Sequence, residues 1–146
     1  MDGGILVGDV GGTNVRFAIA RRENDRIVAE GFDKLAGDDF GAFDEALAAY
    51  LDQSGTNVRR ACFAMAGPVQ NGEVLLTNRQ WHVSEKQLCE KFDFADVRLI
   101  NDFTAMARSV PEHESSAFES ILPGHPVESA PVLVAGPGTG FGVATL

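Results

Sequence analysis

Residues 8–14 combine the residue types of a phosphate-binding turn. The segment directly follows the apolar run of residues 5–7 and reads Gly8, Asp9, Val10, Gly11, Gly12, Thr13 and Asn14. Two adjacent glycines allow positive φ and leave backbone N–H groups open to a ligand, and a row of such amides can bind an anion. The Asp9 carboxylate would repel a bare phosphate, so the segment predicts a phosphate carried with Mg²⁺. An ordinary hairpin turn explains the same residues, because Gly and Asn are common in turns.

A second candidate site is the pair Asn101 and Asp102, which ends the apolar run of residues 97–100. A helix-like segment, residues 104–109, follows the pair, and α/β sheets bind ligands where strands end and helices begin. An aspartate there can accept a proton from a substrate hydroxyl, while the asparagine fixes neighbouring hydroxyls. Aspartate is also a common helix N-cap, where it stabilises the helix by about 1 kcal/mol. The spacing allows both roles for Asp102.

Two further clusters contain residue types that can contact ligands. One is a second glycine-rich turn, which consists of Gly138, Thr139 and Gly140. It lies between two apolar runs, as the first turn does, and this weak internal duplication predicts a second phosphate-facing turn. The other cluster consists of Thr77, Asn78 and Trp81. These residues could border a sugar, or they could mark a turn beside a buried tryptophan.

The first glycine turn needs strands on both sides, and the N-terminal half of the sequence predicts them. Residues 4–10 and 14–21 are predicted strands, and residues 27–29 with Phe32 add a third. The short polar links between them favour an antiparallel meander. A continuous apolar run, residues 61–66, ends at Gly67 and predicts a strand buried on both faces.

Two helices are predicted beside these strands. An apolar stripe at helical spacing marks the first of them, and it consists of Phe40, Phe43, Leu47, Tyr50 and Leu51. Asp38 or Asp39 can cap the start of this helix, and Gly55 lies just past its end. Ser84 and Gln87 form a capping-box pattern at the start of a second helix. Strands and helices in this order indicate an α/β layered domain.

A polar segment rich in Pro and Gly, residues 111–131, marks a predicted domain boundary. Residues 1–110 form the predicted first domain, with the first glycine turn and the Asn101–Asp102 pair. Residues 111–146 form the predicted start of a second domain, which carries the second glycine turn. The 146-residue chain ends within the second strand of that unit. We therefore expect it to be a fragment or to need a partner.

Composition excludes several classes of function. The net charge is −9, and nucleic acids and anionic membranes bind basic surfaces. We therefore expect neither nucleic acid nor a membrane as a partner. The two cysteines lack CxxC spacing, and no secretory signal is recognisable, so we expect a cytoplasmic protein with reduced thiols. The sequence has no P-loop, GxGxxG or GxSxG motif, and its three histidines lack the spacing of zinc ligands.

Four segments taken together resemble one family. They are LVGDVGGTNVRFAIA, FAMAGPVQNGEVLLTNRQW, LINDFTAMA and VAGPGTGFGVA, which occur here in that order. They closely resemble the bacterial glucokinases of the proteobacterial type, in the actin-like ATPase superfamily. The resemblance covers essentially all 146 residues. It implies an α/β, ribonuclease-H-like actin-type ATPase domain with a mixed sheet, followed by the beginning of a second similar domain, with the active site in the cleft between the two.

The resemblance implies transfer of the γ-phosphoryl group of ATP to the 6-hydroxyl of D-glucose. On that basis the segment from Gly8 to Thr13 resembles the first ATP phosphate loop, in which Asp9 acts on Mg²⁺ through water. Asp102 resembles the general base that takes the 6-hydroxyl proton, and Asn101 resembles a sugar ligand beside it. The second glycine turn, Gly138 to Gly140, resembles the second phosphate loop.

The family's further sugar ligands and adenine pocket lie downstream of the matched segments. We therefore expect these 146 residues alone to turn over glucose poorly or not at all, and we expect a homodimer when the protein is complete. Two alternatives stay open. One is a related kinase for another hexose or another phosphoryl donor. The other is a non-catalytic sugar-binding module.

Overall fold

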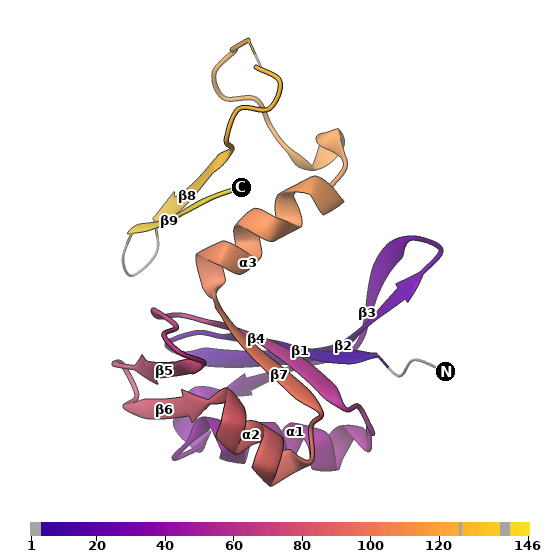
Figure 1. Ribbon diagram of the computed structural model, residues 1–146, viewed down its shortest axis with the longest axis vertical. Helices are drawn as coiled ribbons and strands as arrows, with labels where there is room; N and C mark the ends of the chain where they lie inside the picture. The colour runs from indigo at the N-terminus through magenta and orange to yellow at the C-terminus, as the bar shows by residue number, and fades with distance from the viewer. Residues whose placement is uncertain (1–3, 126, 138–140) are drawn as a thin grey trace. The chain divides into compact units, whose positions relative to one another are not determined.

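A mixed sheet of five strands occupies the N-terminal part of the chain in the computed structural model, which describes residues 4–125, 127–137 and 141–146 (Figure 1). Its strand order is β3-β2-β1-β4-β7. β1 (Ile5–Val10), β2 (Asn14–Glu23) and β3 (Arg26–Ala36) are antiparallel neighbours. β4 (Arg60–Met65) and β7 (Asp96–Asn101) run parallel to β1. The predicted meander is confirmed, and its third strand is longer than expected.

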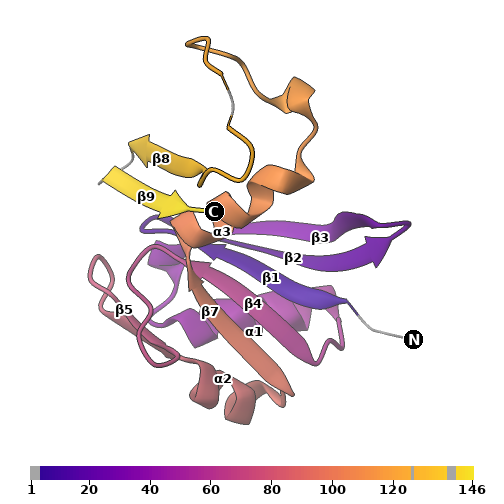
Figure 2. The same ribbon diagram turned by 45° about the horizontal axis from the view of Figure 1, so that its top comes forward.

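Helices α1 (Phe43–Ser54) and α2 (Glu85–Phe92) lie on the same face of this sheet in both views (Figures 1 and 2). Alternation along β2 points Val15, Phe17 and Ile19 toward the core, and all three side chains are buried. The rings of Phe43 on α1 and Phe63 on β4 meet edge to face at 5.1 Å between centroids. This packing fixes the positions of β1, β4 and β7, and therefore of the residues at their carboxyl ends.

The predicted start of the first helix was wrong, whereas its end is confirmed. Gly55 is left-handed (φ 59°) and donates its N–H to the Leu51 carbonyl, 3.0 Å away. The N-cap is Ala42, and Asp38 belongs to a separate short 3₁₀ helix, η1 (Gly37–Asp39). The reason is tertiary, because the N–H of Gly37 bonds to the carbonyl oxygen of Thr13 (3.0 Å) and ties η1 to the sheet.

Two further local expectations are met in part. β4 is the predicted strand, but only Ala61, Phe63 and Met65 are buried, whereas Cys62 and Ala64 on its other face are half-buried. Ser84 is the N-cap of α2 without a side-chain capping bond. Instead, the Glu85 carboxylate accepts a hydrogen bond from the backbone N–H of Leu99 (2.8 Å).

A separate two-stranded hairpin connects β4 to α2 along the chain. β5 (Glu73–Leu76) and β6 (Trp81–Ser84) pair in antiparallel fashion, and residues 77–80 form their turn. Trp81 is 3% exposed and contacts the core, so the tryptophan of this segment is a packing residue.

The chain packs as two units, Met1–Asp102 and Phe103–Leu146. The division into domains 1–110 and 111–146 stays a prediction. Helix α3 (Asp102–Ser109) starts two residues earlier than expected and is followed by η2 (Val110–Glu112) and η3 (Ser115–Ala117). β8 (Leu133–Pro137) and β9 (Phe141–Thr145) form the expected hairpin. Among the described residues, none of the helices has the length and apolar character needed to span a membrane.

Candidate functional site

The carboxyl ends of three parallel strands form the edge that carries the predicted site residues. In the sheet register Val10 of β1 pairs with Met65 of β4, and Met65 pairs with Asn101 of β7. The glycine turn follows Val10 directly, and Asp102 follows Asn101. Neighbouring strands are about 4.8 Å apart, so about 10 Å separates the ends of β1 and β7. The structure therefore brings together two segments that are 90 residues apart in the sequence.

The glycine turn is closed by backbone hydrogen bonds at both ends. The N–H of Gly11 donates to the carbonyl oxygen of Asn14 at 3.0 Å, and the carbonyl of Val10 accepts from Ala66 at 3.0 Å. Gly12 and Thr13, at the tip, are exposed. The turn is thus anchored at its base and open to a ligand at its tip.

Asp9 lies on β1 immediately before this turn and forms an ion pair with Arg16. The two residues are direct cross-strand partners on β1 and β2, and Arg16 Nη1 lies 2.5 Å from Asp9 Oδ2. Their side chains are 51% and 42% exposed. Exposed ion pairs contribute little to stability, about 0–1 kcal/mol. The Asp9 carboxylate can therefore exchange this partner for a hydrated cation at low cost.

Asn101 and Asp102 are linked to the turn that follows β4. The Asn101 side-chain amide donates to the Gly67 carbonyl oxygen at 3.2 Å and to Asp102 Oδ1 at 2.9 Å. Both residues are half-buried. The amide holds the Asp102 carboxylate against rotation, which suits a base that must meet a hydroxyl in one orientation. Asp102 is also the first residue of α3, so its position at a helix start is compatible with the alternative structural role.

Gly8 and Gly12 have different neighbours. A Cβ on Gly8 would lie 2.8 Å from Phe63 Cδ1, inside the core. A Cβ on Gly12 would lie 2.8 Å from the side-chain nitrogen of Asn78. The β5–β6 turn therefore packs against one side of the exposed tip, at Gly12, and the hollow between the two turns has a volume of about 20 Å³.

Arg79 was missed by the sequence reasoning. It stands between two of the residues singled out, Asn78 and Trp81, but the pattern gives it no periodicity or spacing of its own. In the structure its guanidinium reaches the carbonyl oxygens of Gly12 and Thr13. The one feature of the sequence that could have indicated this role is the position of Arg79 in a turn between two apolar segments.

Two predicted features remain, the second glycine turn and the magnesium site. Gly138, Thr139 and Gly140 lie outside the described residues. The described residues contain no group of three or more His, Cys, Asp or Glu side chains arranged to hold a metal ion. Mg²⁺ usually keeps several waters and binds one or two carboxylates together with substrate phosphates. A single carboxylate such as that of Asp9 is compatible with this mode of binding.

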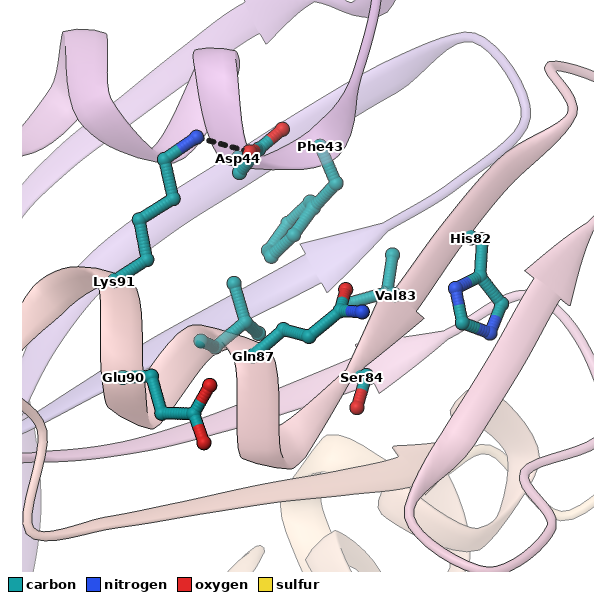
Figure 3. A pocket seen from close by; sticks show the side chains of 9 residues that line it. Phe43, Asp44, His82, Val83, Ser84, Gln87, Glu90 and Lys91 are labelled. Atoms are coloured by element: carbon teal, nitrogen blue, oxygen red, sulfur yellow. Dashed lines mark hydrogen bonds and ion pairs between the residues drawn. The ribbon is translucent and has the colours of Figure 1, made fainter.

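A separate pocket of about 400 Å³ lies between α1, β6 and α2. Figure 3 shows Lys91 of α2 reaching toward Asp44 of α1, with which it forms an ion pair. The pocket is lined by Phe43, Asp44, His82, Val83, Ser84, Gln87, Leu88, Glu90 and Lys91. None of the predicted site residues belongs to this lining, so the pocket is not part of the candidate site.

Comparison with known proteins gives consistent matches over the whole chain. The family model described as Glucokinase matches residues 6–146. A curated glucokinase from Marinobacter nauticus is 38% identical over 142 residues, which cover 97% of this chain and 44% of that protein. The chain thus spans less than half the length of this relative.

Solved structures give the same result for the fold. The crystal structure of a glucokinase from an Antarctic psychrotroph matches with a TM-score of 0.87 and 39% identity, covering 100% of this chain and 46% of that one. A glucokinase from Balamuthia mandrillaris, in complex with glucose, matches with a TM-score of 0.72 and 27% identity over 97% of this chain and 44% of that one. The predicted ribonuclease-H-like, actin-type ATPase fold is confirmed.

Proposed function

Because the chain belongs to the glucokinase family, we propose that its full-length gene product transfers the γ-phosphoryl group of ATP to the 6-hydroxyl of D-glucose. One observation carries the proposal: the glycine turn after β1 and the Asn101–Asp102 pair at the end of β7 lie at the same sheet edge, with β4 between them. Phosphoryl transfer requires mainly that donor and acceptor be held side by side in the correct orientation. The glucose complex of the Balamuthia relative supports glucose as the acceptor.

Asp102 is the proposed general base. As the 6-oxygen of the sugar forms its bond to the γ-phosphorus, the Asp102 carboxylate accepts the hydroxyl proton, and the bond to the β-phosphate oxygen breaks to release ADP. Asn101 holds that carboxylate through the 2.9 Å hydrogen bond and contacts a neighbouring sugar hydroxyl. Both residues are therefore proposed sugar ligands, and Asp102 is the proposed catalytic residue.

The segment from Gly8 to Thr13 is the proposed first phosphate site. The exposed tip at Gly12 and Thr13 offers backbone N–H groups and a hydroxyl to the phosphate oxygens. Bound Mg²⁺ neutralises charge on the phosphates, and Asp9 is proposed to contact it through water. Gly138 to Gly140 are proposed as the second phosphate contact on the basis of the motif alone.

The remaining proposals concern the whole protein. We propose a cytoplasmic protein that forms a homodimer when complete, on the basis of the family resemblance. The net charge of −9 supports a protein that binds neither nucleic acid nor anionic membranes. Light scattering of the full-length gene product tests the dimer directly, and a monomeric mass would contradict it.

The test of the reaction compares wild type with Asp102→Asn in the full-length gene product. Glucose 6-phosphate is measured by a coupled assay with Mg·ATP and D-glucose, and competing hexoses and polyphosphate are run in parallel. The variant keeps the shape of the side chain but cannot accept the proton, so kcat should fall by about 10²–10⁴-fold while glucose affinity changes little. Asp96→Asn is the matched control, because Asp96 begins β7, the strand that leads to Asp102, and pairs with Arg98 away from the candidate site.

Three outcomes would contradict parts of this proposal. Near-normal turnover by Asp102→Asn would show that Asp102 is not the general base and serves only to stabilise the start of α3. Preference for another hexose or for polyphosphate would make the protein a related kinase. Glucose binding by calorimetry without ATP consumption would make it a sugar-binding module.

A further inference from the structure

Arg79 connects the β5–β6 turn to the tip of the glycine turn. Its Nε donates to the carbonyl oxygen of Gly12 at 2.9 Å, and its Nη2 donates to the carbonyl oxygen of Thr13 at 3.0 Å. The side chain is only 9% exposed, although it carries a full charge. A guanidinium presents its donors in a rigid planar fork, so two neighbouring carbonyl groups can be held at once.

The surroundings of Arg79 keep this fork in one orientation. Nη1 forms an ion pair with Asp38 at 2.8 Å, and the guanidinium lies over the ring of Trp81, 5.3 Å from its centroid. A Cβ at Gly37 would lie 2.6 Å from Arg79 Cζ, so this buried glycine leaves the space that the guanidinium occupies. Gly37 in turn donates its N–H to the carbonyl of Thr13.

This arrangement decides which way the peptide groups of the turn point. In a trans peptide the C=O and the following N–H point in opposite directions. With the Gly12 carbonyl bound to Arg79, the N–H of Thr13 points away from Arg79. Glycine pairs allow such a peptide group to rotate, because they lack the Cβ that restricts φ and ψ. Arg79 therefore prevents the rotation of the Gly12–Thr13 peptide group that the glycines would otherwise allow.

We propose that Arg79 is a positioning residue that holds the amides of the glycine turn in the orientation that receives the phosphates of ATP. The inference rests on the proposed function, since it assumes that the turn binds phosphate. Arg79 acts through the Gly12 and Thr13 carbonyls and is not itself a ligand of the phosphates. Its fork, and not its charge alone, is the essential property.

The kinetic test uses the full-length gene product with Arg79→Gln and Arg79→Lys. In Arg79→Gln we expect kcat/KM for Mg·ATP to fall by about tenfold or more, through a raised KM for Mg·ATP, while the KM for glucose changes by less than about twofold. Lysine keeps the charge but lacks the planar fork, so Arg79→Lys should behave like Arg79→Gln. Arg59→Gln is the matched control, because Arg59 forms an exposed ion pair with Asp93 (3.0 Å).

Specific kinetic results would overturn the proposal. A normal KM for Mg·ATP in Arg79→Gln would refute the positioning role. This holds even if kcat falls, because a lower kcat with an unchanged KM indicates only that a smaller fraction of the enzyme is folded. Full activity of Arg79→Lys would show that charge suffices without the fork.

A second measurement does not depend on enzymatic activity. In the 146-residue chain, amide hydrogen exchange of Gly11 and Gly37 should accelerate by about tenfold in Arg79→Gln but not in Arg59→Gln, because Arg79 braces both hydrogen-bonded amides. Unchanged exchange would refute the positioning role. If wild type phosphorylates no sugar while exchange responds as expected, the proposed function fails and the bracing by Arg79 stands.

Discussion

Replacing Gly8 with alanine separates a packing requirement from a ligand requirement at the start of the glycine turn. A Cβ at Gly8 would lie 2.8 Å from Phe63 Cδ1 and 3.1 Å from Phe17 Cδ1. Carbon atoms pack at about 3.5–4.0 Å, so the contact with Phe63 is at least about 0.7 Å too close. The two rings are 0% and 1% exposed and therefore cannot move into solvent.

The expected cost follows from two opposing effects. Overpacking a close-packed core costs about 1–3 kcal/mol. Alanine in place of a strand glycine recovers about 0.5–1 kcal/mol of conformational entropy. The contact with Phe63 is too close by about 0.7 Å, which places Gly8→Ala in the upper half of the overpacking range, about 2–3 kcal/mol. We therefore expect it to lower the free energy of unfolding by about 1–2.5 kcal/mol.

Urea unfolding of the chain measures this cost, with the fluorescence of its single tryptophan, the buried Trp81, as the probe. Gly11→Ala is the matched control from the same turn. A Cβ at Gly11 meets its nearest neighbour, the carbonyl oxygen of Asn14, at 3.4 Å, and no loss of stability is expected.

A double substitution identifies the clash itself. In a Phe63→Leu background the ring that Gly8→Ala would strike is gone, so the cost of Gly8→Ala should shrink by at least about 1 kcal/mol. An equal cost in both backgrounds, or a neutral Gly8→Ala in wild type, would refute the packing argument. Gly8 would then be required only by the ligand.

Two further predictions concern Tyr50 and Cys62. Tyr50→Phe removes the hydroxyl that donates to the Gly31 carbonyl oxygen at 2.8 Å, so the free energy of unfolding should fall by about 1 kcal/mol; an unchanged urea midpoint at neutral pH would contradict this. Burial, with a contribution from Asp33, raises the pKa of Tyr50 above 10.0, and burial, with Glu85, raises the pKa of Cys62 above 9.0. Because the folded chain holds these two protons more tightly than the unfolded chain, their contribution to stability is full below about pH 9 and is lost as pH rises through the raised values. Urea midpoints at about pH 8 and pH 10.5 measure the loss, which should be smaller in Tyr50→Phe and Cys62→Ser than in wild type; equal losses in all three chains would refute the assignment.

Much of the local structure was predictable, because turns and periodic patterns depend on neighbouring residues. The glycine turn, the left-handed Gly55 and the strand before Asn101 all follow from residue type and spacing. The expected caps of the two helices were less reliable. Asp38 turned out to pair with Arg79, which lies 41 residues away, and Ser84 makes no capping bond. A local capping pattern cannot reveal that a more distant partner competes for the same side chain.

In the candidate site, too, the residue types were predictable and their contacts with distant residues were not. Residue chemistry alone selected Asp9, Asn101 and Asp102, and the structure adds the contacts that define each of them. Arg16 pairs with Asp9 because the two residues are opposite each other in the β1–β2 register. The carbonyl of Gly67 accepts from Asn101 because β4, which Gly67 follows, pairs with β7 and places Met65 opposite Asn101.

The sequence by itself indicated where the backbone turns, which segments form most of the strands and helices, and which side chains are candidates for the proposed phosphoryl transfer. These properties depend on φ and ψ preferences and on apolar periodicity, which act over a few residues. Only the tertiary structure decided that Arg79 reaches Gly12 across 67 residues and that Gly8 must leave room for Phe63. Such contacts depend on strand order, register and core packing, which arise when distant segments bury their apolar faces together.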